Sequence, residues 1–167
     1  MISLKEARKE VIDIIGQDKV PAYSTLGDWI NKGFISGVIE GTSRGAKYPD
    51  HIVYEIITAI KLKNEHNIKL KDIAKFRENA GLNKVRNLDK LYKKLTDYVN
   101  KLEKEQEKMS KKALLSVEDL SINELGKSLL EVKKIKLKLE FLKRYEKIFS
   151  KNVKVNKPVK PKENNIL

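Results

Sequence analysis

The side chains best suited to ligand recognition gather between positions 23 and 48. This segment offers hydroxyl, amide and cationic groups. Hydroxyls and amides can read base edges, and cations can contact phosphates. The chemistry that this set predicts is binding of double-stranded DNA. The expected contact residues are Tyr23, Ser24, Thr25, Gly27, Asn31, Arg44, Lys47 and Tyr48.

The rest of the sequence offers no pattern typical of an enzyme or of a metal site. The chain has no cysteine, and its two histidines, His51 and His66, have no second ligand near them in sequence. No glycine-rich phosphate loop and no cluster of histidine with carboxylates is present. We therefore expect no catalytic residue, no metal and no cofactor.

A short helix followed by a polar loop is expected to position the contact residues. Ser24 or Thr25 can cap the helix at its start, and Gly33 can end it in the left-handed conformation. The buried face of this recognition helix consists of Leu26, Trp29 and Ile30. The polar loop that follows begins at Gly41, ends at Tyr48-Pro49 and is expected to form a wing that contains Arg44 and Lys47.

The sequence predicts three further helices in the head, one before the recognition helix and two after the wing. Ser3 and Glu6 form a capping box at the start of the first, which ends at Gly16. The third begins after Pro49 and ends at Asn67, and the fourth is closed by Gly81. The expected order is helix, recognition helix, wing, helix, helix.

This order resembles the MerR-type winged helix-turn-helix family over roughly the first half of the chain. The matching residues are Ser24-Thr25-Leu26, Trp29, Gly33-Phe34-Ile35, Tyr48-Pro49 and Ile68-Lys69-Leu70-Lys71-Asp72-Ile73. Where the family has arginine and tyrosine after Thr-Leu, this chain has Gly27 and Asp28. Because a carboxylate repels phosphate, Arg44 and Lys47 are expected to supply the phosphate contacts. The resemblance implies a transcriptional regulator.

The second half of the chain carries the periodicity of long packed helices. Leu88, Leu95, Leu102 and Met109 recur every seven residues, and residues 116–121 interrupt the pattern. A second helix is expected from there to Phe149, and it is too apolar for one neighbour. A helical hairpin that assembles as a dimeric or tetrameric bundle fits both helices. The expected oligomerisation residues are Leu88, Leu95, Leu102, Leu125, Leu129, Val132, Leu139 and Leu142.

The positive charge lies mainly outside the predicted head. The net charge is +13, of which residues 1–82 contribute +2, residues 83–149 contribute +7 and residues 150–167 contribute +4. The last segment alternates lysine with valine and proline, so we expect a disordered tail that binds an anionic surface, either membrane or additional DNA. Its expected contacts are Lys151, Lys154, Lys157, Lys160 and Lys162.

These observations predict a mainly α protein with three parts: a DNA-binding head (1–82), a helical oligomerisation region (83–149) and a basic tail (150–167). No apolar run reaches the ~20 residues that span a bilayer, so a cytoplasmic protein is expected, with a peripheral place at the inner membrane face as the alternative. The first functional hypothesis is an oligomeric, sequence-specific transcriptional regulator. The alternative is a DNA-anchoring factor that resembles the TubY-type accessory regulators of tubulin-based plasmid and phage partition, with partition proteins as partners.

Overall fold

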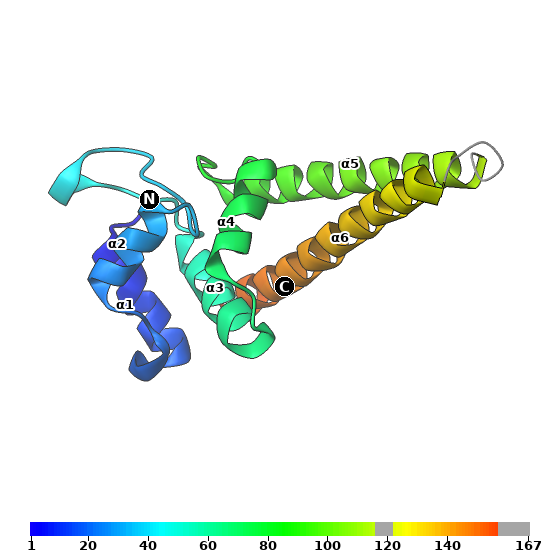
Figure 1. Cartoon of the computed structure of the whole chain (residues 1–167). Coiled ribbons are helices and arrows are strands. Elements are labelled where there is room, and N and C mark those ends of the chain that lie inside the picture. The colour runs from blue at the N-terminus through cyan, green and yellow to red at the C-terminus, as the bar shows by residue number, and fades with distance from the viewer. Residues whose placement is uncertain (116–121, 157–167) are drawn as a thin grey trace, which may run out of the picture.

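The computed structural model describes residues 1–115 and 122–156, and within them the fold is mainly α. Six α-helices occupy these residues, in the order shown in Figure 1. Their bounds are α1 Leu4–Ile15, α2 Tyr23–Asn31, α3 Ile52–His66, α4 Leu70–Asn79, α5 Leu88–Leu115 and α6 Ile122–Asn156. None of the six is long and apolar enough to cross a bilayer.

Helix α3 is the centre of the head because it packs against α1 on one side and α6 on the other. The buried residues of α3 include Ile52, Ile56 and Leu62. Most of the helix is buried because other helices pack on both sides of it. Helix α1 begins with the expected capping box: the Ser3 amide donates to Glu6 Oε2 at 2.8 Å, and the Glu6 amide donates to Ser3 Oγ at 3.3 Å.

Helix α2 begins earlier than its sequence predicted. Tyr23 is its first residue and Ala22 occupies the N-cap position without a side-chain hydrogen bond, so the predicted caps Ser24 and Thr25 lie inside the first turn. Pro21 directly precedes the N-cap residue Ala22, and its carbonyl accepts a hydrogen bond from Arg8 Nε at 2.9 Å. That bond ties the chain to α1 before α2 begins. The end of the helix was predicted correctly, since Gly33 has φ +75°.

The predicted wing is not formed, because residues 1–115 and 122–156 contain no β-strand. The segment between α2 and α3 has two isolated antiparallel bridges, one between Ile2 and Tyr48 and one between Glu40 and Lys47. Gly41, with φ +77°, turns the loop so tightly that a Cβ atom there would collide with the Gly45 carbonyl.

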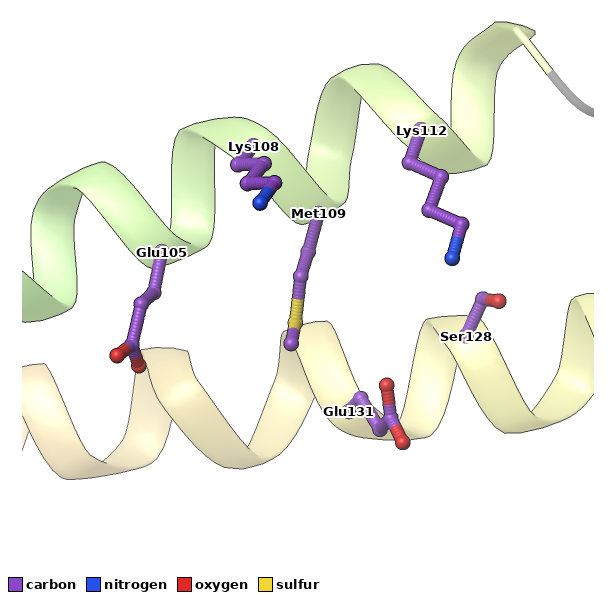
Figure 2. A pocket seen from close by; sticks show the side chains of 6 residues that line it. All are labelled: Glu105, Lys108, Met109, Lys112, Ser128 and Glu131. Carbon is purple, nitrogen blue, oxygen red and sulfur yellow. The ribbon is translucent and has the colours of Figure 1, made fainter.

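Helices α5 and α6 form the predicted hairpin within one chain (Figure 1). Four of the residues predicted for contacts between chains, Leu95, Leu102, Leu139 and Leu142, are buried in it together with Leu91 and Ile135. The two helices are less closely packed near Met109, whose apolar side chain lies between them (Figure 2). There a cavity of about 470 Å³ is lined by Glu105, Lys108, Met109, Lys112, Ser128 and Glu131.

Helix α6 runs seven residues past Phe149, which corrects the predicted start of a disordered tail at residue 150. Asn152 and Val153 are buried, and Asn152 Oδ1 accepts a hydrogen bond from Lys61 Nζ at 2.9 Å. The end of α6 is therefore attached to α3. Lys151 and Lys154 lie on this helix, whereas the predicted contacts Lys157, Lys160 and Lys162, like the predicted break at 116–121, lie outside the described residues.

Candidate nucleic-acid interface

The exposed face of α2 carries most of the predicted contact residues. The side chains of Tyr23, Ser24, Thr25 and Asn31 are exposed, and Gly27 is half-buried. Beneath this face Leu26 and Trp29 are buried, and the Trp29 ring meets the edge of Phe34 at 6.4 Å between centroids. The helix thus presents a polar surface on a rigid apolar base.

Tyr48 does not belong to this surface, which corrects its predicted role in DNA contact. Its side chain is only 8% exposed, and burial raises the pKa of its phenol. Its backbone pairs with Ile2 through two hydrogen bonds, of 2.9 and 3.0 Å, which join the N-terminal residues to the end of the loop. Tyr48 is a structural residue because this pairing turns its ring into the core.

The two predicted phosphate contacts of the loop stand in different environments. Arg44 is exposed in the turn Ser43–Gly45. Lys47 is half-buried near the start of α1, where Glu6 lies within its electrostatic reach. The pKa of Glu6 is lowered, first by its hydrogen bonds with Ser3 and to a lesser degree by Lys47. Glu6 therefore stays ionised and offsets part of the positive charge of Lys47.

Helix α1 contributes cations that sequence reasoning missed. Lys5, Arg8 and Lys9 line an open groove of about 870 Å³ together with Tyr23 of α2. Ser3, Glu6 and Ile12 complete the lining. The spacing of Lys5 and Lys9, four residues apart on the polar face of an amphipathic helix, was the available signal. Its meaning required knowing that the face borders α2.

A buried ion pair lies in the core of the head. Arg77 Nη1 donates to Glu55 Oε1 at 2.5 Å, and both side chains are 0% exposed. Burial disfavours the charged guanidinium, but Glu55 and Tyr145 together outweigh burial, so the pKa of Arg77 is raised. His51, at the start of α3, is also buried, and burial lowers its pKa.

The described part of the chain holds no group of three or more histidine, cysteine, aspartate or glutamate side chains able to bind a metal ion. No family model, no curated protein and no solved structure matches this chain.

Proposed function

We propose that this protein is a sequence-specific DNA-binding regulator that reads duplex DNA with α2. One observation carries the proposal: Tyr23, the first residue of the exposed face of α2, lines a groove together with Lys5, Arg8 and Lys9 of α1. A helix of 9 residues is about 14 Å long, which suits a major groove about 12 Å wide. In helix-turn-helix proteins the helix before the recognition helix lies across the phosphate backbone.

The roles within this surface follow from side-chain chemistry. Tyr23, Ser24 and Asn31 would contact base edges through hydroxyl and amide groups. Lys5 and Lys9 would contact phosphates, joined by Arg44 of the loop. Asp28, exposed on α2, repels phosphate and would favour a position over the bases.

The experiment that tests this proposal compares two double variants with equal loss of charge. Lys5→Ala with Lys9→Ala should weaken binding to fragments selected from the source genome and reduce the slope of log Kd against log salt by about two. The control, Lys101→Ala with Lys104→Ala, removes two exposed cations from α5, away from the groove. Equal effects of the two variants at every salt concentration would show that the surface beside α2 does not dock DNA.

We propose further that the protein acts as an oligomer through the outer face of α6. Leu129, Leu130 and Leu137 are 56%, 51% and 56% exposed, although the hairpin already buries the opposite face of the helix. An apolar stripe of this kind favours a second helical partner. Half-sites in DNA are commonly read by paired recognition helices.

Sedimentation distinguishes an oligomer from a monomer. Leu130→Asp with Leu137→Asp should shift the full chain to the monomer, because the stripe would then carry charge into an interface. Thr96→Asp with Asn100→Asp adds the same two carboxylates to exposed positions of α5 and should leave the assembly intact. A monomeric parent chain at micromolar concentration would rule the oligomer out.

The alternative function, anchoring of DNA to an anionic surface as in partition systems, draws support from a second basic groove. This groove of about 420 Å³ lies between the ends of α3 and α6. It is lined by Lys61, Glu65, His66, Lys143, Arg144, Lys147, Ile148 and Lys151. Lys143→Ala with Lys147→Ala should then weaken binding to phosphatidylserine vesicles but leave selected-fragment binding unchanged. Retention of vesicle binding by this variant would remove the support that the groove gives.

A further inference from the structure

The side chain of Arg77 connects four parts of the head. It projects from α4, is fully buried, and reaches α3, α6 and the loop that follows α2. Nη1 donates to Glu55 Oε1 at 2.5 Å and to Tyr145 Oη at 3.2 Å. Nη2 donates to Ser36 Oγ at 3.2 Å and to the Leu82 carbonyl at 3.5 Å. We refer to Ser36, Glu55, Arg77 and Tyr145 as the Arg77 network.

One end of the network fixes the loop through which the chain leaves the recognition helix. The Ser36 amide donates to Glu55 Oε2 at 2.8 Å, so both the backbone and the hydroxyl of Ser36 are bound to the ion pair. The next amide, of Gly37, donates to the Asn83 carbonyl at 3.2 Å. The Phe34 amide returns to the Trp29 carbonyl at 2.9 Å. Only a few residues, held by these hydrogen bonds, therefore separate the end of α2 from the Glu55–Arg77 ion pair.

The other end of the network belongs to the long helix of the hairpin. Tyr145 of α6 is fully buried, and its ring lies 5.0 Å from Phe76 and stacks on Phe149 at 6.2 Å between centroids. Burial raises the pKa of Tyr145 to about 12, so its hydroxyl is neutral at physiological pH. In Figure 1 this end of α6 lies beside α3, whereas its other end reaches the tip of the hairpin.

The guanidinium group of Arg77 is planar, so its N–H donors point in fixed directions. A movement of one acceptor therefore changes the position of the donors that face the other acceptors. Four acceptors hold the group at once, on α3, on α6, in the loop after α2 and at Leu82, while Arg77 Nε is buried without a partner. If Tyr145 loses its hydroxyl, Nη1 keeps only its bond to Glu55, and rotation of the group about that bond is opposed only by the two longer Nη2 bonds, to Ser36 Oγ and to the Leu82 carbonyl. Rotation moves Nη2, and Ser36 is bonded to Nη2.

We infer that Tyr145 is a positioning residue for DNA recognition: through Arg77 it makes the geometry of the loop after α2 depend on how α6 is seated on the head. The inference rests on the proposed function. It links DNA affinity to the hairpin, although no described residue of α5 or α6 lines the groove beside α2. Any event that shifts the base of α6 would then change DNA binding through Ser36.

The first test removes one oxygen atom from the full chain. Tyr145→Phe keeps the ring contacts and should weaken binding to a selected DNA fragment about fivefold, since the lost hydrogen bond joins a charged group. Hydrogen exchange of the Ser36 amide should become faster, while amides in the middle of α1 and α5 stay unchanged. Tyr92→Phe is the matched control, because Tyr92 also packs on Phe149, at 5.8 Å, but makes no hydrogen bond with Arg77.

The second test asks whether Tyr145 and Ser36 act through the same group. Ser36→Ala alone should weaken DNA binding, and adding Tyr145→Phe should cause less further loss than Tyr145→Phe causes in the parent chain. Additive effects, or parental affinity in Tyr145→Phe, would overturn the inference and leave the proposed function standing. A parent chain that binds no duplex DNA would refute the function itself. A general increase of amide exchange across α1 and α5 in Tyr145→Phe would show a purely structural role and also overturn the inference.

Discussion

Replacing Arg77 by methionine should destabilise the protein more than any surface substitution. Glu55 would keep the hydrogen bond from the Ser36 amide, at 2.8 Å, but lose the cation that faces it. Removing one partner of a fully buried ion pair costs about 3 to 5 kcal/mol. Because domains are commonly stable by only about 5 to 15 kcal/mol, this loss would be a large fraction of the total.

The assay is urea unfolding at pH 7, followed by helical circular dichroism. Arg77→Met should lower the urea midpoint with little change of slope, and lower the melting temperature by about 6 to 20 °C. Lys111→Met provides the control, since it breaks the exposed Lys111–Glu107 pair, and it should leave the midpoint almost unchanged.

A double variant separates a stranded charge from a lost packing contact. Glu55→Met with Arg77→Met removes both charges and should be more stable than Arg77→Met alone, although the Ser36 amide then loses its acceptor. Two outcomes would refute the reasoning: a parental midpoint for Arg77→Met, or a double variant that is less stable than the single one.

The remaining predictions concern pH, the hairpin and the loop. Because burial lowers the pKa of His51 below its ordinary value of 6.5, the unfolded chain takes up a proton first, so stability should fall as the pH drops below about 6.5. Urea midpoints at several pH values should show a weaker fall in His51→Gln and an unchanged one in His66→Gln. Leu142→Ala should cost about 2 to 5 kcal/mol because Leu142 is fully buried, whereas Leu129→Ala should have a far smaller effect on the unfolding of a monomer. Gly41→Ala should weaken DNA binding and lower the melting temperature, since a Cβ atom would collide with the Gly45 carbonyl; a parental affinity would contradict the loop's role.

Helix boundaries could be predicted where neighbouring residues determine them. The capping box of Ser3 and Glu6 starts α1, and Asn67, with φ +53°, ends α3 in the left-handed conformation. Gly81, with φ +69°, follows α4 in the same way. Each of these signals acts within one turn of the chain, so a single sequence contains it.

Features that depend on distant residues could not be predicted in this way. Tyr48 was expected at the surface because it ends a polar loop, but pairing with Ile2, 46 residues earlier, places it in the core. Glu55 and Arg77 are 22 residues apart, and no helical spacing relates them. Lys5 and Lys9 could be recognised as a polar face, but the sequence did not show that α2 would lie beside them.

Heptad leucines posed a different problem, because the same pattern serves packing within a chain and between chains. Leu95 and Leu102 were predicted to join separate chains, and they pack against α6 of the same chain. Leu129 fits the predicted role better, since its side chain is left exposed on the hairpin. Periodicity thus identified apolar faces without identifying their partners.

The predicted division between head and hairpin underestimated how far α6 enters the head. Tyr145, Phe149 and Val153 belong to the same buried cluster as Ile56 of α3. Phe149 also meets the edge of the Tyr54 ring at 6.2 Å, so the base of α6 closes the side of α3 that α1 leaves open. Apolar residues therefore continue along α6 beyond its contact with α5, because the last turns of α6 pack against α3. A helix shared in this way makes the hairpin part of the scaffold that holds α2, and this shared packing is why Tyr145 is expected to affect the proposed DNA-binding surface without being part of it.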